Sequence, residues 1–261
     1  MTVYPNVKLN LGLRVLGKRE DGYHELQTAF VPYYGFSDTL EIVPASSFEV
    51  EISGPQYGGW EPSEDLTARA WRLLRADFGI APVHISLEKN SPVGAGLGGG
   101  SADGAFALEV LNDMFSLGLS RSELALYAAC LGSDCPFFIY NFPMYATGRG
   151  EVLEPLSLPL DGWRFEVEVP QGVHVSTREA YAGITPSGPA AAGTDLRTLL
   201  SATPVERWKD VIVNDFEPSV FAKHPEIESL KSNMYSRGAV FAAMSGSGSA
   251  VFGIFADSRT K

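Results

Sequence analysis

Basic residues are scarce in this sequence. Its 20 lysines and arginines are outnumbered by 31 aspartates and glutamates, which leaves a formal net charge of -11 over 261 residues. Proteins that bind nucleic acid or anionic membranes through general electrostatics are normally basic, so this charge disfavours both kinds of partner. An anionic substrate would therefore have to be bound by a local positive field, supplied by backbone amides and a few placed cations.

Cysteine and histidine are scarce as well. The two cysteines, Cys130 and Cys135, cannot build a disulfide framework or a four-ligand zinc site, and the four histidines form no HExxH-type pair. No apolar run approaches the roughly 20 residues of a membrane-spanning helix, and the N-terminus lacks the basic-then-apolar pattern of a signal peptide. We therefore expect a cytoplasmic protein without a metal centre of its own, to which any metal ion comes with a nucleotide.

The chain is nevertheless rich enough in hydrophobic residues, at 45%, to form one large or two small domains. Alternating apolar positions predict strands over residues 3–16, 26–34, 40–52, 83–87, 164–169 and, as two strands around a turn, 240–255. Helical spacing and a capping box at Ser120 and Glu123 predict helices over residues 66–78, 106–114, 121–132, 195–202 and 225–237. Residues 186–193 read as a loop. Strands and helices mix without a steady βαβ order, which indicates an α+β fold.

A glycine-rich run, PVGAGLGGGSADG over residues 92–104, lies between a predicted strand and a predicted helix. Glycine allows close approach of the backbone to a ligand and the positive φ angles that direct successive N–H groups into one concavity. The start of a helix adds unpaired N–H donors and a partial positive charge. The run therefore predicts an anion-binding loop suited to a polyphosphate.

Several common glycine motifs do not fit this run. Gly94, Gly96 and Gly99 form GxGxxG, but the region about 20 residues later lacks the strand-end acidic residue that a dinucleotide fold requires. Gly100 and Ser101 lack the lysine of a Walker A loop, and no HRD or DFG follows for a protein kinase. A plain glycine linker remains an alternative, although linkers seldom lie between an alternating strand and an amphipathic helix.

The segment from Pro92 to Ser101 resembles the second motif of the GHMP kinases, a superfamily of small-molecule kinases. Other segments resemble one branch of that superfamily, in which the acceptor alcohol carries a cytidine diphosphate tail. These segments are NVKLNL at residues 6–11, REDGYH at 19–24, GSDCPFF at 132–138 and NDFE at 214–217. A serine/glycine turn at residues 244–249 resembles the third superfamily motif. The matches together span residues 6 to about 255.

Three positions depart from the pattern of the family. Asn6 replaces a usual proline, and Ala102 replaces a second serine. Asp65 stands where the family often has an asparagine near the adenine, which puts that one contact in doubt. None of the three removes a residue that phosphoryl transfer requires.

The resemblance implies an α+β, two-domain GHMP kinase fold. A ribosomal protein S5 domain 2-like N-terminal domain would occupy residues 1–155, and a ferredoxin-like C-terminal domain would occupy residues 156–261. The resemblance further implies that ATP with Mg²⁺ phosphorylates the 2-hydroxyl of a cytidine diphosphate-linked methylerythritol, in non-mevalonate isoprenoid precursor biosynthesis. The expected partner is this small-molecule substrate, with no nucleic acid and no membrane, and the protein would be a monomer or a weak homodimer.

Two catalytic residues follow from the resemblance. Asp134 maps to the base that takes the proton of the acceptor hydroxyl, and Lys8 maps to the lysine beside that base. The alternative for Asp134 is a helix N-cap, since Cys135 and Pro136 suit a first helical turn, and both roles can coexist. The alternative for Lys8 is a strand lysine whose charged end reaches the surface.

The resemblance also implies the nucleotide site. Lys89 aligns with a nucleotide-contacting lysine, although it could be a plain surface lysine. Ser101 is a possible ligand for Mg²⁺. The turn of Ser245, Gly246, Ser247 and Gly248 would support the phosphate loop, or it could be only a hairpin loop. The ATP-binding residues of the loop would be Pro92, Val93, Gly94, Ala95, Gly96, Leu97, Gly98, Gly99, Gly100, Ser101 and Ala102.

Recognition of a cytidine requires aromatic stacking and hydrogen bonds to the edge of the base. The residues that align with the acceptor site are Asn10, Tyr23, His24, Thr177 and Tyr181. Tyr181 could instead pack a helix, and His24 could be an ordinary turn residue.

Two other functions remain open. One is a GHMP kinase acting on homoserine, mevalonate or a sugar, which the DGYH segment disfavours because those acceptors have no cytosine. The other is a nucleotide-binding protein that has lost catalysis, which the presence of both Lys8 and Asp134 disfavours.

Overall fold

The computed structural model describes residues 1–184 and 194–257, and its elements form two compact units. Unit 1 comprises Met1–Lys8, Pro32–Val93 and Gly98–Phe142, and unit 2 comprises Leu9–Val31, Gly94–Leu97 and Pro143–Lys261. Strands β2 (Asn6–Lys18) and β3 (His24–Ser37) each run from one unit into the other. The units therefore interleave along the chain. The single domain boundary near residue 155 stays a prediction, and the loop predicted at residues 186–193 lies outside the described residues.

Unit 1 contains a four-stranded sheet in the order β1 (Thr2–Val3), β4 (Thr39–Pro44), β6 (Val83–Glu88), β5 (Glu49–Ser53). Strand β6 pairs antiparallel with β4 and parallel with β5. The single strand predicted over residues 40–52 is therefore wrong, because the segment forms two strands on opposite sides of β6. Strand β4 ends at Pro44, which has no N–H group with which to continue a ladder.

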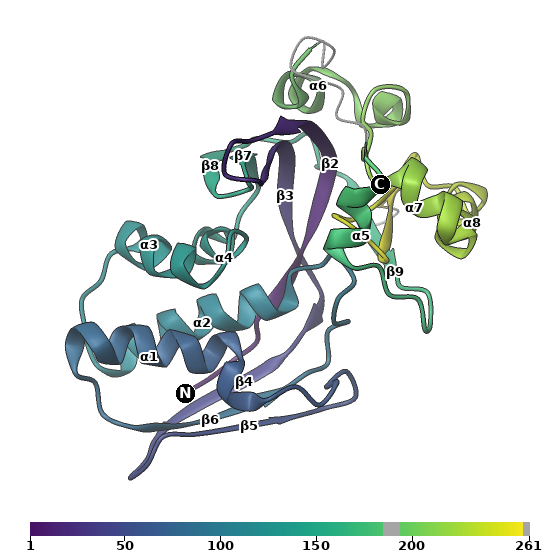
Figure 1. The fold of residues 1–261 in the computed structure, drawn as a ribbon. Coiled ribbons are helices and arrows are strands. Elements are labelled where there is room, and N and C mark those ends of the chain that lie inside the picture. The colour runs from purple at the N-terminus through teal and green to yellow at the C-terminus, as the bar shows by residue number, and fades with distance from the viewer. Residues whose placement is uncertain (185–193, 258–261) are drawn as a thin grey trace. The chain divides into compact units, whose positions relative to one another are not determined.

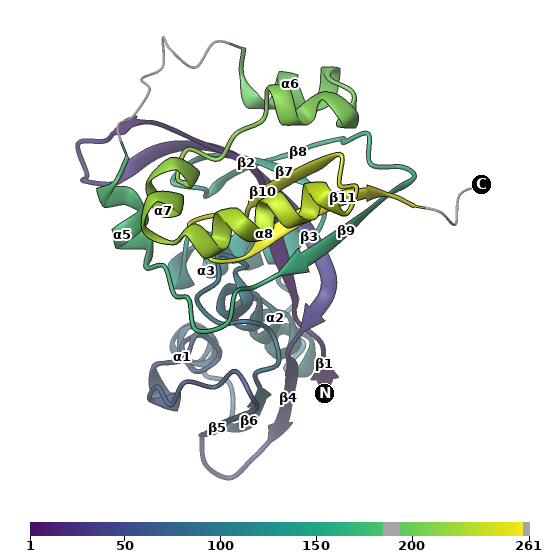
Figure 2. The same cartoon turned by 90° about the vertical axis from the view of Figure 1, so that its right-hand side faces the viewer.

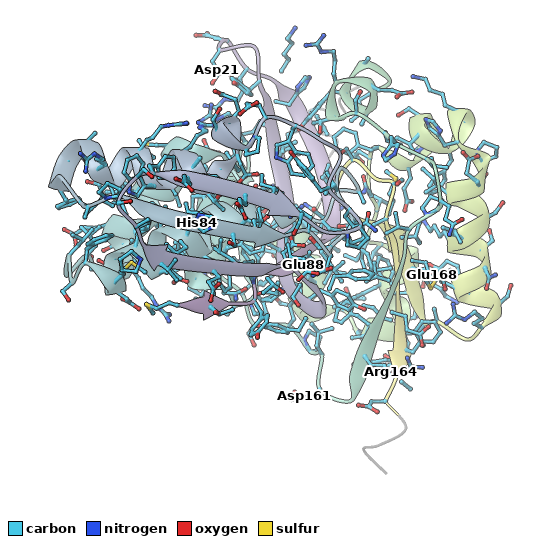
Figure 3. The ribbon with its side chains drawn as sticks, turned by 90° about the horizontal axis from the view of Figure 1, so that it is seen from below. Asp21, His84, Glu88, Asp161, Arg164 and Glu168 are labelled. Atoms are coloured by element: carbon cyan, nitrogen blue, oxygen red, sulfur yellow. The ribbon has the colours of Figure 1, made fainter. Side chains whose placement is uncertain are left out.

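Helices α1 (Leu66–Phe78) and α2 (Gly99–Met114) cover one face of this sheet (Figure 1). The bounds of α1 match the prediction, and the residues that cap the helix explain why it begins and ends there. The Asp65 side chain accepts a hydrogen bond from the Thr67 N–H at the first turn, and Gly79 ends the helix in a left-handed conformation. The other face of the sheet carries the side chains of His84 and Glu88 (Figure 3).

Helices α3 (Arg121–Leu131) and α4 (Cys135–Tyr140) complete unit 1. The predicted capping box is confirmed, because the Ser120 hydroxyl accepts from the Glu123 N–H and the Glu123 carboxylate accepts from the Ser120 N–H. Helix α3 stops before Gly132, close to the predicted end. The short helix α4 was not predicted, and it follows directly on the segment that carries Asp134.

Unit 2 contains two sheets. One has the order β2, β3, β7 (Met144–Gly148), β8 (Val152–Pro155), and its last two strands were not predicted. The other has the order β10 (Phe241–Met244), β11 (Val251–Ala256), β9 (Trp163–Glu168), and all three strands were predicted. Helix α8 (Pro225–Ser236) packs along this second sheet (Figure 2). The shorter helices of unit 2 are α5 (Thr177–Ala182), α6 (Leu196–Ala202), α7 (Glu217–Lys223) and the 3₁₀ segment η2 (Val205–Asp210), whereas the 3₁₀ segment η1 (Pro62–Glu64) belongs to unit 1.

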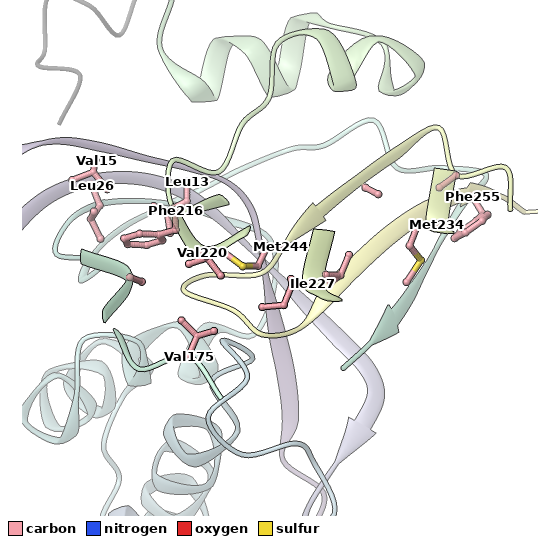
Figure 4. Packing of buried hydrophobic residues seen from close by; sticks show 14 residues of the cluster. Leu13, Val15, Leu26, Val175, Phe216, Val220, Ile227, Met234, Met244 and Phe255 are labelled. Atoms are coloured by element: carbon pink, nitrogen blue, oxygen red, sulfur yellow. The ribbon is translucent and has the colours of Figure 1, made fainter. Parts of the chain in front are cut away.

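The core of unit 2 joins these elements. Leu13 of β2, Phe216 and Val220 before and in α7, Ile227 of α8 and Met244 of β10 belong to one buried cluster (Figure 4). Burial of each large apolar side chain contributes about 1.5–3 kcal/mol, so this cluster holds together segments distant in sequence. Among the helices of the described chain, none is long and apolar enough to cross a membrane.

A buried charge cluster lies beneath the start of α2. The Asp38 carboxylate, with no solvent exposure, accepts hydrogen bonds from the N–H groups of Asn90 at 2.6 Å and Ser91 at 2.7 Å, and from the ammonium of Lys89. Lys89 also donates to Asp103 Oδ2 of α2 at 2.5 Å. One ammonium group therefore serves two buried carboxyl groups, and it ties the end of β3 and the segment before the glycine loop to α2.

Asp103 is the less well compensated of the two carboxyl groups. Its Oδ1 atom is buried and has no hydrogen-bond partner among the residues that the structure describes. Burial raises the pKa of Asp103 well above its usual range, the ammonium of Lys89 opposes that rise, and the charge of Asp38 adds to it. The charged form of Asp103 is therefore the unfavourable form in the folded protein.

Replacement of Asp103 by asparagine tests this cluster. Because the pKa of Asp103 is raised in the folded state, the contribution of Asp103 to the free energy of unfolding should fall as pH rises above about 4, the ordinary pKa of aspartate. Asp103→Asn lacks that ionisation, so its stability relative to wild type should increase with pH. Urea unfolding at a series of pH values would measure both proteins, with Asp113→Asn on the exposed face of α2 as the control. If the free energy of unfolding of Asp103→Asn instead fell further below that of wild type as pH rises, the ionised carboxylate would be the stabilising form.

Candidate active site

Lys8 and Asp134 lie together in unit 1. Lys8 Nζ is 3.5 Å from Asp134 Oδ2, and the side chains are 5% and 35% exposed, respectively. Burial lowers the pKa of Lys8, and the attraction of Asp134 opposes that shift. The pair thus combines an enclosed cation with a carboxylate that a solute can still reach, which is the arrangement that the sequence predicts for the catalytic residues.

The segment before α4 leaves the Asp134 carboxylate available. Asp134 occupies the N-cap position of α4, with Pro136 in the first turn, but its side chain makes no capping hydrogen bond. The helix-cap role that the sequence left open is therefore not supported by the structure. Gly132 and Cys135 pack closely here, since a β-carbon on Gly132 would lie 3.3 Å from the Cys135 sulfur.

Gly98 brings the glycine loop against Lys8. Its φ is +72°, and it immediately precedes α2. A β-carbon at this position would lie 3.1 Å from Lys8 Cε and 3.3 Å from Phe138 Cζ. A side chain here would be strained and would displace the lysine, so the glycine is required by both conformation and space. The N-terminus of α2 begins beside the Lys8–Asp134 pair, with no side chain of the described residues capping it.

Ser101 lies in the first turn of α2, where the sequence places a possible Mg²⁺ ligand. Its hydroxyl shares a hydrogen bond with the Cys135 thiol, and burial raises the pKa of that thiol to about 12. Cys135 is therefore an uncharged thiol near neutral pH. Within residues 1–184 and 194–257, no cluster of three or more His, Cys, Asp or Glu side chains could hold a metal ion.

The first half of the glycine loop, Gly94–Leu97, belongs to unit 2 and packs on the turn between β10 and β11. Gly94 and Gly96 have φ of +70° and +78°. A β-carbon on Gly96 would lie 2.1 Å from the Ser245 carbonyl oxygen, and the Ser245 hydroxyl donates to the Gly96 carbonyl at 3.1 Å. The Ala250 N–H donates to the Ala95 carbonyl at 3.0 Å. The predicted supporting role of the Ser245–Gly248 turn agrees with these contacts.

Two asparagines donate hydrogen bonds to this turn. The Asn10 N–H donates to the Ser245 hydroxyl at 3.1 Å, and the buried Asn10 amide donates to Thr28 Oγ1 at 3.1 Å. The Asn214 amide donates to the carbonyls of Met244 and Gly246, both at 2.8 Å. The sequence predicts a substrate contact for Asn10, and that contact stays a prediction. No role was predicted for Asn214 from the sequence. Its place in the NDFE segment was the only indication that it matters.

The predicted cytidine residues divide into two aromatic contacts within unit 2. The ring of His24, at the start of β3, stacks on Tyr181 of α5 with centroids 4.5 Å apart and planes at 20°. The rings of Tyr181 and Phe216 also form a T-shaped contact, with their centroids 4.9 Å apart and their planes at 84°. A base can therefore join this stack only on an outer face or by separating the two rings. The Thr177 hydroxyl lies 3.5 Å from the Ser247 hydroxyl, which links α5 to the turn.

Tyr23 is separate from that stack and 56% exposed. The guanidinium of Arg149, in the turn between β7 and β8, lies 4.8 Å from the centre of its ring. Arg149 could not be predicted as a neighbour of Tyr23, because nothing in its local sequence indicates that two turns meet here.

Lys89 is placed differently from the other predicted ATP-binding residues. It is 1% exposed, and its ammonium lies between Asp38 and Asp103. The alternative of a surface lysine is wrong. A nucleotide contact through this ammonium stays a prediction that the closed cluster does not support, because the cluster would have to open first. A β-carbon on Gly99 would lie 2.7 Å from Ser91 Oγ, so the start of α2 rests directly on this cluster.

Comparisons with known proteins agree with this geometry. Residues 65–142 match the family model described as GHMP kinases N terminal domain, and residues 196–261 match the model described as GHMP kinases C terminal. The chain is 45% identical to 4-diphosphocytidyl-2-C-methyl-D-erythritol kinase of Bacteroides thetaiotaomicron, over 98% of this chain and 92% of that protein. It is also 45% identical to the protein of that name from Cytophaga hutchinsonii, with the same coverage.

Solved structures give the same result for the fold. A crystal structure of 4-(cytidine 5'-diphospho)-2C-methyl-D-erythritol kinase is similar with a TM-score of 0.77 and 36% identity, covering 97% of this chain and 89% of that chain. Homoserine kinase from Cytophaga hutchinsonii has a TM-score of 0.71 at 15% identity, covering 97% and 86%, and that likeness shows the fold alone. The α+β fold predicted from the sequence is confirmed, and the chain belongs to the GHMP kinase family.

Proposed function

We propose that this chain transfers the γ-phosphoryl group of ATP to the 2-hydroxyl of 4-diphosphocytidyl-2-C-methyl-D-erythritol. The observation that carries the chemistry is the Lys8–Asp134 pair beside Gly98 at the start of α2. The acceptor follows from relatives that bear the name of this kinase and are 45% identical over nearly the whole chain.

The Lys8–Asp134 pair supplies the proton chemistry. The acceptor hydroxyl loses its proton as its oxygen bonds to phosphorus, and the partly exposed Asp134 carboxylate accepts that proton. The enclosed ammonium of Lys8 attracts the charge that develops on the alcohol oxygen. Burial makes this attraction stronger than it would be in water, because few water molecules screen it.

The glycine loop and the N-terminus of α2 would bind the phosphates. Left-handed glycines at 94, 96 and 98 alternate with ordinary residues, and the first turn of α2 adds further N–H donors. Mg²⁺ would come with ATP and take phosphate oxygens and water as most of its ligands, with Ser101 as the candidate side chain. The ion would neutralise charge on the phosphates during transfer.

The cytidine part of the acceptor would be read by Tyr23, His24 and Tyr181, with Asn10 and Thr177 as neighbouring polar residues. The aromatic rings offer stacking faces, and the imidazole of His24 can hydrogen bond to a base edge. Other acceptors of the family, such as homoserine or mevalonate, have no base for these residues to bind. A panel of these alcohols with ATP and Mg²⁺, followed by ADP release, separates the alternatives.

The Asp134→Asn change tests the base. The amide keeps the shape of the side chain but cannot accept the proton, so kcat should fall by about 10²–10⁴-fold. The melting temperature should fall only modestly, since the change removes the ion pair between Lys8 and a partly exposed carboxylate but no capping bond of α4. Asp161→Asn, on an exposed loop residue before β9, is the control and should keep wild-type kcat. A wild-type kcat in Asp134→Asn would exclude this residue as the base.

The Gly98→Val change tests the loop. A β-carbon forced onto a left-handed backbone 3.1 Å from Lys8 Cε should displace the loop and the lysine together. ATP affinity, measured by calorimetry, should fall at least about tenfold, or about 1.4 kcal/mol. Gly17→Ala is the control, because a β-carbon there has no neighbour within 4 Å. Unchanged ATP binding in Gly98→Val would mean that the run is a linker.

The Tyr181→Ala change tests recognition of the base. Stacking on a base is worth about 1–3 kcal/mol in nucleic-acid sites, so the acceptor should bind about 5- to 150-fold more weakly while ATP affinity stays near wild type. 2-C-methyl-D-erythritol 4-phosphate, which lacks the cytidylyl group, should be a poor acceptor and nearly indifferent to the change. Tyr34→Ala, on a residue 68% exposed, is the control. Equal phosphorylation of the truncated and full alcohols by wild type would refute cytidine recognition.

A further inference from the structure

A groove that the kinase reaction does not use lies along the C-terminal half of α2, within unit 1. Its volume is about 380 Å³, within the range of small-molecule pockets. Its walls come from β1, α2 and the start of α3. The apolar residues that line it are Met1, Val3, Phe106, Val110, Leu119 and Leu124.

One acidic side chain in this groove lacks a partner of its own. Glu109 of α2 is half-buried, and among the described residues nothing donates a hydrogen bond to its carboxyl group or forms an ion pair with it. Burial raises the pKa of Glu109 to about 7, the charge of Arg121 opposes that rise, and the charge of Asp113 adds to it.

The charged groups around the groove do not neutralise Glu109. Arg121 of α3 is exposed and lies beyond ion-pair distance, and Asp113 of α2 carries charge of the same sign. Directly before β1, the Met1 ammonium donates to the Ile42 carbonyl at 2.6 Å. The groove is thus lined by both apolar and polar side chains, with Asn112, Asp113 and Arg121 among the polar ones. Among the described residues, Glu109 is the lining carboxyl group that has no hydrogen bond or ion pair.

We propose that this groove binds an apolar organic cation, with its ammonium group on Glu109 and its hydrocarbon part against Phe106, Val110 and Leu119. An anion would be repelled by Glu109. A neutral hydrocarbon would cover the carboxyl group without giving it a hydrogen bond, which costs free energy. A cation with an apolar body satisfies both the charge and the lining.

The site is separate from the nucleotide loop. Glu109 comes ten residues after Gly99 on the same helix, which places it about 15 Å along the axis from the first turn. The cation should therefore bind without competing with ATP, and binding can be measured in the intact enzyme with or without nucleotide.

The test uses n-hexylammonium as the probe and n-hexanol as its neutral counterpart, with calorimetry on the full chain. Hexylammonium should bind saturably near pH 8, more tightly than hexanol, and about tenfold more weakly near pH 6, where Glu109 is largely protonated. Glu109→Gln should lose at least about tenfold in affinity and lose the pH dependence, with kcat unchanged.

Asp113→Asn is the matched control, because it removes one negative charge from the same helix one turn later and should keep most of the affinity. Thermal melting of both variants checks that they are folded. Absence of saturable binding near pH 8, equal affinity for hexanol, tighter binding near pH 6, or full affinity in a folded Glu109→Gln would each overturn the proposal.

Discussion

A carbonyl oxygen, a lysine side chain and a serine hydroxyl come within 2.1 to 3.1 Å of the positions that β-carbons would take on three glycines of one loop. The Ser245 carbonyl does so at Gly96, the Lys8 side chain at Gly98 and the Ser91 hydroxyl at Gly99. The loop can follow its path only with glycine at these three positions. Because of that, the turn after β10, the Lys8 side chain and the buried cluster under α2 can each reach the backbone of the loop within their own unit.

Local chemistry made much of the fold predictable from the sequence. Helix α1 begins and ends where Asp65 and Gly79 cap it, and α3 begins where Ser120 and Glu123 form their capping box. The glycine loop was recognisable because positive φ angles and close approach both select glycine. These features need only neighbouring residues, so a single sequence contains the information.

Features that depend on distant partners could not be predicted. The segment 40–52 alternates like one strand, and only its pairing with both sides of β6 shows that it is two. Lys89 follows a strand like a surface lysine, and its burial depends on Asp38, which lies 51 residues earlier. The role of Asn214 depends on a turn 30 residues later. In each case a long-range contact decided the outcome, and no local preference reports such a contact.

The interleaving of the units has a consequence for the order in which the protein is made. Every segment of unit 1 precedes residue 143, so a ribosome has supplied all of that unit before β7 is synthesised. The parts of β2 and β3 that belong to unit 2, residues 9–31, must then wait for their neighbour β7 and for the core residues of α7 and α8. During that interval their apolar side chains, Leu13 and Val15 among them, have no permanent cover. The nascent chain thus exposes the apolar side chains of these strands until the later segments of unit 2 have been made.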